Sequence, residues 1–241
     1  MHHLDDFMRR FAGYGNESSE LWFVGLEEGG GRTIEELTLR VDTWNERGHR
    51  SLEDLADYHR AIGQATYFDP PYPLQRTWAP LCRVRQAWLG RSADVATIKN
   101  VQGQELGRTA GRTNLVELMP LPATSLSHWP YASLVAEHPA LRDRDTYRHT
   151  YTPLREALLR DLIQASGSRT VVFYGQRPDS WSAIAGRPLR EIVIDDRRCY
   201  AAASQGRYFL AVPHPMARGL TSAFWAAAGA HLRAMAPPAL R

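Results

Sequence analysis

Four short apolar runs recur along the chain and predict buried strands. They cover residues 21–25 (LWFVG), 113–118 (TNLVEL), 170–175 (TVVFYG) and 207–212 (RYFLAV). Each run is too short for a helix, and two of them end at a glycine. The run at 170–175 is β-branched and apolar on both faces, which is typical of a strand inside a parallel sheet. The pattern therefore predicts a parallel sheet whose strands are joined by long connections.

Helical patterns fill the segments between these runs. Thr33 and Glu36 form a capping box that predicts a helix to about Arg47. Strands and helices that alternate along a chain form α/β domains, with the sheet layered between helices. We therefore expect one α/β domain over residues 1–241. Its further predicted helices lie at 51–62, 78–88, 145–166 with an interruption near Pro153, 179–185 and 220–235, and its further strands at 190–195 and 198–203.

Composition narrows the function classes. No segment has the apolar length of a membrane span, and the start of the chain lacks the apolar middle of a secretory signal, so we expect a cytoplasmic protein of the bacterial cytosol or nucleoid. The two cysteines, Cys82 and Cys199, are isolated and cannot form a zinc or iron–sulfur set. We expect no metal and no cofactor. The net charge of +3 permits a polyanionic partner without requiring one.

Polar residues follow the predicted strands at positions that favour a shared site. In open parallel sheets, the site forms outside the carboxyl ends of the strands. This rule brings together Glu27, Glu28, Asn114 and His214, although they lie far apart in the sequence. A carboxylate activates water, an amide reads a planar polar ring, and an imidazole donates to a developing anion. The set suits the chemistry of a polar heterocycle.

Three of these segments, in order, resemble motifs of the uracil-DNA glycosylase superfamily. GLEEGGG at 25–31 resembles its first, water-activating motif, TNLV at 113–116 its strand asparagine, and HPMARG at 214–219 its His-Pro motif. The strand TVVFYG resembles the one that lies between the last two motifs. The resemblance implies a three-layer α/β/α sandwich around a central four-stranded, mainly parallel sheet. It also implies an enzyme that flips a base out of DNA and hydrolyses its N-glycosidic bond.

The resemblance assigns roles to individual residues. Glu27 takes the catalytic position after Gly25, with Glu28 as an alternative one residue later. Asn114 would read the base edge, and His214 would hydrogen-bond the carbonyl oxygen where negative charge collects. Pro213 and Pro215 restrict the backbone around His214. Other residues are expected at the DNA or against the flipped base: Gly29, Gly30, Gly31, Pro215, Arg218 and Gly219 for DNA, Gly25 against the base, and Trp44, Phe68, Tyr72 or Trp78 for stacking on it.

Two departures from the family pattern leave alternatives open. Glu28 stands where the family has a proline, and Met216 stands where it has a serine. Taken singly, the glutamates fit a helix start, Asn114 a turn, and His214 a half-buried histidine. Arginines at 142, 144, 148, 155 and 160 are typical of a solvated helix face.

The function that these residues predict is a monomeric, monofunctional DNA glycosylase. It would remove uracil or a related deaminated base from DNA in base-excision repair. The alternatives are a uracil- or DNA-binding protein of the same fold with little or no turnover, and an enzyme that acts on a free nucleoside.

Overall fold

Four parallel strands form the middle of one sheet. The computed structural model describes residues 2–125 and 127–239. The strands are β2 (Leu21–Glu27), β4 (Thr113–Met119), β5 (Thr170–Tyr174) and β8 (Arg207–Val212), in the order β4-β2-β5-β8. All four predicted runs are therefore strands, and adjacent strands within this set of four pair in parallel. The carboxyl ends of all four open toward the same edge of the sheet.

The sheet is wider than the four strands that the family resemblance implies. It has eight strands in the order β3-β1-β4-β2-β5-β8-β7-β6 and is mixed. At one side, β1 (Gly13–Tyr14) runs antiparallel to β4 and pairs with β3 (Leu52–Glu53). At the other side, β7 (Arg197–Ser204) and β6 (Arg190–Ile194) extend β8 as antiparallel strands. The four-stranded prediction is therefore too narrow, because hairpin and two-residue strands extend both edges.

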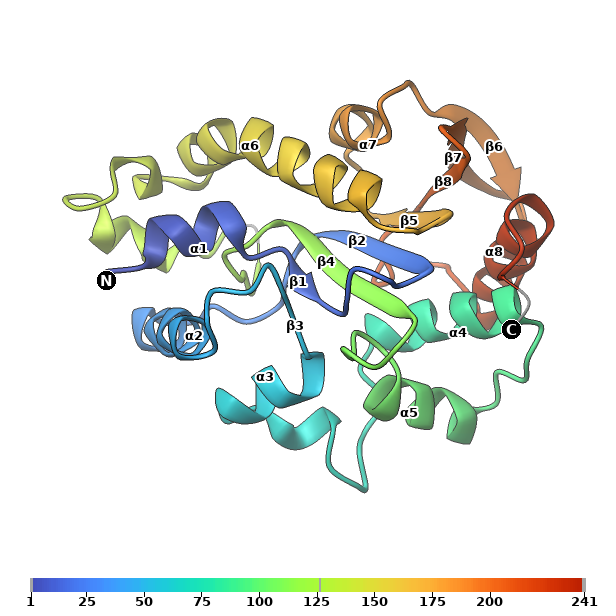
Figure 1. Cartoon of the computed structure of the whole chain (residues 1–241), viewed down its shortest axis with the longest axis horizontal. Helices are drawn as coiled ribbons and strands as arrows, with labels where there is room; N and C mark the ends of the chain where they lie inside the picture. The colour runs from blue at the N-terminus through green and yellow to red at the C-terminus, as the bar shows by residue number, and fades with distance from the viewer. Residues whose placement is uncertain (1, 126, 240–241) are drawn as a thin grey trace.

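Helices cover both faces of the sheet (Figure 1). One layer contains α6 (Arg144–Ala165) and α7 (Pro178–Ala185), with α1 (Leu4–Arg10) beside α6. The other contains α4 (Trp78–Leu89), α5 (Val95–Gln104) and α8 (Ser222–Met235), and α4 packs along α8. The remaining helices are α2 (Ile34–Glu46), α3 (Leu55–Ala61) and three short 3₁₀ turns at Ala65–Tyr67, Pro130–Leu134 and Pro139–Leu141.

Local chemistry explains where the predictions hold and where they are wrong. Thr33 caps α2 as predicted, by accepting a hydrogen bond from the Glu36 amide. The cap of α3 is Asp54 and not Ser51, because residues 52–53 pair with β1 instead. Helix α6 continues through Pro153, which lies with His149 on the exposed face, where the carbonyl that loses its helical donor is open to solvent. Helices α1 and α5 have no predicted counterpart.

The core lies on both faces of the parallel strands. Trp22, Phe23, Val24, Val171 and Val172 are fully buried within it. Among residues 2–125 and 127–239, none of the helices combines the length and the apolar character that crossing a bilayer needs. The sheet thus forms a rigid base that fixes the ends of β2, β4, β5 and β8 relative to one another.

Candidate functional site

A cavity of ≈ 610 Å³ opens at the carboxyl end of the parallel strands. Glu27 and Glu28 contribute from the end of β2, Glu117 from β4, Tyr174 from β5 and His214 from the loop after β8. The predicted crevice is therefore present at this edge of the sheet. The rest of its lining comes from β1, β4 and the segment after β4, from the segments around α2 and α3, and from the 64–78 loop: Tyr14, Gly29, Gly30, Arg32, Glu36, His59, Gln64, Tyr67, Gln75, Thr77, Trp78, Leu115 and Ala123.

Glu28 is held as a carboxylate by three partners. Its Oε1 lies 3.2 Å from Arg40 Nη1 and 3.0 Å from His59 Nε2, and its Oε2 accepts a 2.8 Å hydrogen bond from the Tyr14 hydroxyl. Although burial acts in the opposite direction, Arg40, His59 and Tyr14 together lower the pKa of Glu28 to about 2. Glu28 therefore carries a fixed negative charge at the cavity wall at neutral pH.

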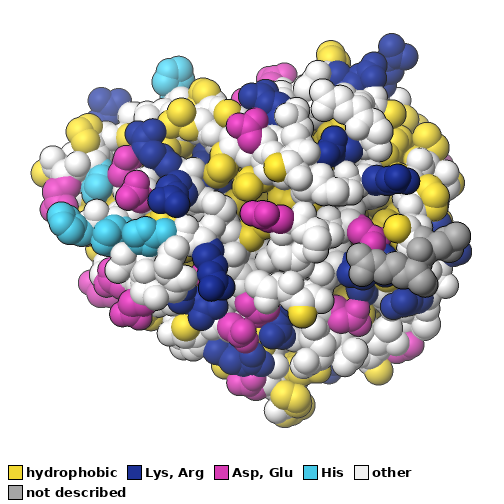
Figure 2. All heavy atoms as spheres, viewed as in Figure 1, with side chains coloured by type: hydrophobic (Ala, Val, Ile, Leu, Met, Phe, Trp, Pro, Cys, Tyr) yellow, Lys and Arg dark blue, Asp and Glu magenta, His cyan; other side chains and the backbone are white. Residues whose placement is uncertain are grey.

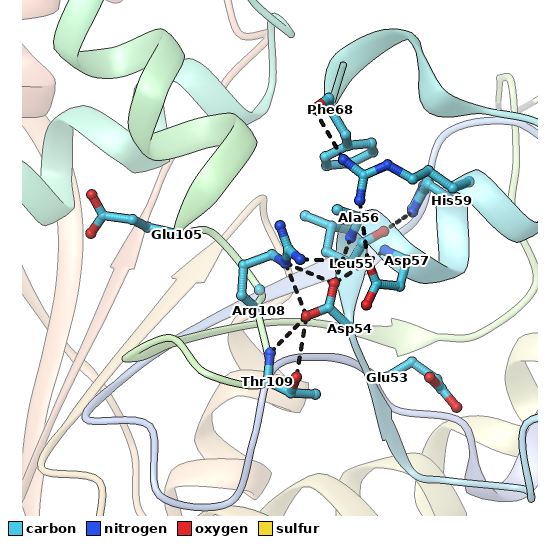
Figure 3. Close-up of polar contacts among 12 residues, drawn as sticks. Glu53, Asp54, Leu55, Ala56, Asp57, His59, Phe68, Glu105, Arg108 and Thr109 are labelled. Atoms are coloured by element: carbon cyan, nitrogen blue, oxygen red, sulfur yellow. Dashed lines mark hydrogen bonds and ion pairs between the residues drawn. The ribbon is translucent and has the colours of Figure 1, made fainter. Parts of the chain in front are cut away.

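His59 extends to Glu28 from α3, whose start is held by Asp54. Figure 3 shows the contacts of Asp54. The Asp54 carboxylate accepts hydrogen bonds from the amides of Ala56 and Asp57 at the start of the helix, and it pairs with Arg108 at 2.7 Å. The Nδ1 atom of His59 lies 2.8 Å from a backbone carbonyl in the same helix. The two ring nitrogens therefore lie between the Leu55 carbonyl and the Glu28 carboxylate, and these contacts fix the orientation of the ring.

Glu27 has both of its oxygens occupied by arginines of α6. Arg144 donates to Oε2, and Arg148 donates to Oε1 at 2.5 Å and 3.1 Å. Arg144 is buried, and it also donates to the carbonyls of Ser125 and His128. The prediction of a solvated helix face is therefore wrong for these arginines, because α6 turns them toward the end of β2. These ion pairs tie β2 to α6.

Arg155 on the same helix is also buried. It donates to the carbonyls of Glu117 and Leu118 at 3.0 Å each. Its guanidinium therefore satisfies backbone groups at the end of β4 and does not face solvent, which again contradicts the expected solvated face.

Glu117 is a site residue that the sequence reasoning missed. It is 9% exposed, and its Oε1 accepts a 2.7 Å hydrogen bond from the Tyr174 hydroxyl. Its Oε2 has no hydrogen-bond partner among the described residues. Burial, together with the charges of Glu28 and Glu27, raises its pKa to about 8. The available signal was a lone charged residue within β4, whose residues are all buried.

Gly25 leaves the space that the Glu117 side chain occupies. A Cβ atom on Gly25 would lie 2.2 Å from Glu117 Oε2 and 2.4 Å from the Tyr174 hydroxyl. Any side chain at position 25 would therefore displace this pair. Gly25 therefore lies under the Glu117 and Tyr174 side chains and does not line the cavity, whereas the sequence predicted that it contacts the base.

His214 lines the cavity and is half-buried. Its Nδ1 accepts a 3.2 Å hydrogen bond from the Met216 amide, and burial lowers its pKa. A neutral ring that accepts at Nδ1 carries its proton on Nε2, so His214 is a neutral donor. Its ring centre lies 6.1 Å from that of Tyr174. The predicted carboxylate and histidine therefore line the same cavity.

Asn114 does not join them. It is the second residue of β4, paired with Trp22 near the start of β2, and it is not among the residues that line the cavity. It is fully buried, and its Oδ1 accepts a 2.8 Å hydrogen bond from the Asn16 amide. The prediction that Asn114 reads the base in the crevice is wrong, because its side chain holds the 14–16 turn at the amino end of the sheet.

The aromatic predictions are partly corrected. Trp44 is fully buried and stacks on His49, with its indole N–H bonded to the Arg50 carbonyl. Phe68 is also fully buried and packs behind Trp78. Neither ring lines the cavity, so neither fits a stacking role there. Tyr72 packs against Gly103 of α5 instead.

Two rings of the 64–78 loop line the cavity, in addition to those of Tyr14, His59, Tyr174 and His214. The two loop rings are Trp78, which was among the predicted residues, and Tyr67, which was not. Their centres are 5.7 Å apart in an edge-to-face arrangement. A flat ligand ring in this cavity would therefore meet aromatic surface on the wall formed by the 64–78 loop.

The glycine turn at 29–31 faces the cavity at its first two residues, whereas Gly31 at its end already contacts other residues of the protein. Gly29 and Gly30 line the cavity. The amides of Gly31 and Arg32, however, donate at 3.0 Å each to the Glu36 carboxylate. Gly31 has a φ of 67° and lies against the Pro122 carbonyl, so its place in the expected phosphate contact is filled.

The residues of the loop after β8 that were predicted to contact DNA differ in their exposure. Pro215 is buried, whereas Met216, Arg218 and Gly219 are exposed. The Gly219 carbonyl accepts a 2.6 Å hydrogen bond from Arg197. Pro215 therefore supports the loop, and Arg218 is the residue available to a ligand outside the cavity.

No protein-family model, no curated protein and no solved structure matches this chain. Within residues 2–125 and 127–239, no group of three or more His, Cys, Asp or Glu side chains is placed to hold a metal ion. The chemistry of the cavity therefore has to be inferred from its own geometry.

Proposed function

We propose that this chain is a DNA glycosylase that removes uracil or a related deaminated base. One observation carries the proposal: an ionised carboxylate, Glu28, and a neutral imidazole donor, His214, line one cavity with two aromatic rings. Breaking an N-glycosidic bond places positive charge on the sugar and negative charge on the base. The site offers an anion for the first and a donor for the second.

The roles follow from the contacts of each group. Glu28 offsets the positive charge that develops on the sugar, because its own charge is fixed by Arg40, His59 and Tyr14. His214 donates from Nε2 to the base carbonyl without first losing a proton. Trp78 and Tyr67 supply the surface against which the base stacks. Glu27 maintains the ion pairs between β2 and α6.

Arginines around the cavity would hold the DNA backbone. Arg32 lines the cavity, and Arg218 lies exposed on the His214 loop. On the face shown in Figure 2, basic side chains are interspersed with acidic ones and form no continuous stripe. This face therefore presents no extended basic track for a DNA backbone.

One observation favours the alternative of a binding protein with little turnover. Glu27, which takes the catalytic position of the resembled motif, has both oxygens occupied by Arg144 and Arg148. If the reaction needs Glu27 free, the cavity would hold a base without cutting its bond.

The test uses labelled oligonucleotides that carry one uracil or one hypoxanthine, single-stranded and in duplex. Alkali cleaves any abasic site that the purified chain produces. We expect a strand break at the deaminated base. A retarded but intact strand would support the binding alternative, and intact strands without retardation would contradict both.

A further inference from the structure

Glu117 is the group in the cavity that the roles above leave unused. It points from β4 into the space above Gly25, and a Cβ atom at position 25 would lie 2.2 Å from its Oε2. One oxygen is bonded to Tyr174, while the other has no partner among the described residues. A buried carboxyl group without a second partner costs stability, so its presence beside a cavity calls for a ligand.

We propose that Glu117 is the general acid of this site, which passes the proton on Oε2 to the base as the glycosidic bond breaks. This inference rests on the proposed function. Its geometric support is the pairing with Tyr174, the unpartnered Oε2 over Gly25 and the position of Glu117 at the cavity wall. The two carboxyl groups thus have different roles: Glu28 is the permanently ionised group, and Glu117 is the proton donor.

The groups around Glu117 keep it protonated. Tyr174 faces it from β5, and the carboxylates of Glu28 and Glu27 face it from the end of β2. Burial and the two carboxylates outweigh the Tyr174 hydrogen bond and bring the pKa of Glu117 to about 8. The phenol of Tyr174 itself stays protonated, since burial raises its pKa far above the usual range. At neutral pH, Glu117 is therefore an acid with a proton to give.

The proposed step balances as follows. The bond between C1′ and the base nitrogen breaks, and its electron pair stays on the base, which takes the proton from Glu117 Oε2 and leaves as a neutral molecule. A water molecule forms the new bond to C1′. One of its protons returns to the Glu117 carboxylate, so the acid is regenerated. The products are the free base and an abasic sugar.

This role identifies a class of substrate. A purine has basic ring nitrogens apart from the one in the glycosidic bond, so an acid can protonate it before the bond is broken. Uracil offers mainly weakly basic carbonyl oxygens, for which a hydrogen-bond donor such as His214 suffices. We therefore expect Glu117 to contribute more to the removal of a deaminated purine, such as hypoxanthine, than to the removal of uracil.

The test measures single-turnover excision of hypoxanthine and uracil from about pH 5 to about pH 9, where the ionisation of the acid falls. We expect the wild-type rate on hypoxanthine to fall above about pH 8. Glu117→Gln should lower that rate by about 10² or more, remove the alkaline fall and affect uracil less. Tyr174→Phe should move the alkaline fall to higher pH, because the Tyr174 hydrogen bond lowers the pKa of Glu117. Glu191→Gln, an exposed strand glutamate, is the matched control.

The possible failures are distinguishable. If wild type excises a base and Glu117→Gln keeps its rate within about threefold with the same pH profile, the acid role is wrong and the glycosylase assignment stands. If wild type excises no base at any pH, the proposed function fails and the acid role fails with it. An infrared difference spectrum of wild type against Glu117→Gln adds a readout without substrate. A protonated-carboxyl band at neutral pH is expected, and its absence would overturn the inference.

Discussion

The two ends of the parallel sheet use buried polar groups differently. At the amino end, Asn114 accepts from the Asn16 amide, and the Asn16 side chain donates at 2.9 Å to the carbonyls of Thr109 and Gly111. These bonds connect loops to one another. At the carboxyl end, Glu28 and Glu117 carry opposite pKa shifts beside an open cavity. Polar burial at the first end joins loops to one another, whereas at the second it places two carboxyl groups with opposite pKa shifts at the cavity wall.

The largest predicted effect is on the charge balance of the carboxyl end. Arg40 is 2% exposed and pairs with Glu28 and Glu36. Arg40→Met leaves Glu28 buried without its main counter-charge, so we expect the free energy of unfolding to fall by about 3–5 kcal/mol in urea denaturation. The control is Arg9→Met, since Arg9 and Asp5 form a half-exposed pair, and about 0–1 kcal/mol is expected there. Equal losses would contradict the difference between the two sites.

The second effect is the pH dependence that Glu117 imposes. The carboxyl group ionises near 4.5 in the unfolded chain and near 8 in the native protein. Between these values only the unfolded state releases the proton, so the Glu117 contribution destabilises the fold as pH rises. Glu117→Gln should therefore be more stable than wild type by a few kcal/mol near pH 8, and the two proteins should be equally stable below pH 4.5.

The effect of Glu28 on the pH dependence of stability has the opposite sign to that of Glu117. Its pKa is lowered from 4.5 to about 2, so its stabilisation is present above 4.5 and is lost as pH falls toward the native value. Thermal melts of wild type and Glu117→Gln over both pH ranges measure the Glu117 effect as the difference between the two proteins, and the Glu28 effect as the loss of stability that both share below pH 4.5. Parallel curves for the two proteins at all pH values would rule out the raised pKa of Glu117.

At the amino end the expected effect is smaller and purely structural. Asn114→Ala removes the acceptor of the buried Asn16 amide, so we expect a loss of about 1–3 kcal/mol in the free energy of unfolding. Asn16→Ala should show similar destabilisation, because the same turn loses its bonds to Thr109 and Gly111. No loss in either variant would mean that this end does not depend on these contacts.

The smallest effect concerns the helix that follows the His214 loop. Thr221 caps α8 by accepting from the Phe224 amide at 3.3 Å. Thr221→Ala should cost about 1 kcal/mol of stability, as for a typical cap. Because the cap lies outside the cavity, the excision rate should stay unchanged. A large loss of excision would place the start of α8 in the site.

Hydrophobic patterning was enough to predict the four parallel strands and most helices, because each of them buries a long apolar run or face. It did not predict β1 and β3, since two-residue strands have no periodicity. The sequence also did not predict that β7 pairs with β8 on one side and with β6 on the other, because strand pairing depends on the tertiary fold.

The site was predicted unevenly. Glu28 and His214 follow strands directly, so the strand-end rule places them correctly. Asn114 was misplaced because the strand-end rule was applied to it although it is the second residue of its strand. Trp44 and Phe68 could not be distinguished from Trp78 by sequence, because burial behind other rings is set by packing. Glu117 was missed because its importance comes from Tyr174, Glu27 and Glu28, which lie on other strands.

The most direct test of the contrast between the two ends is single-turnover excision by His214→Ala and Asn114→Ala beside wild type, on one duplex with a single deaminated base. Both variants are assayed at a temperature where circular dichroism shows them folded. The account predicts that His214→Ala slows excision by about 10² or more, while Asn114→Ala stays within about threefold of wild type. A loss in Asn114→Ala as large as that in His214→Ala would contradict it.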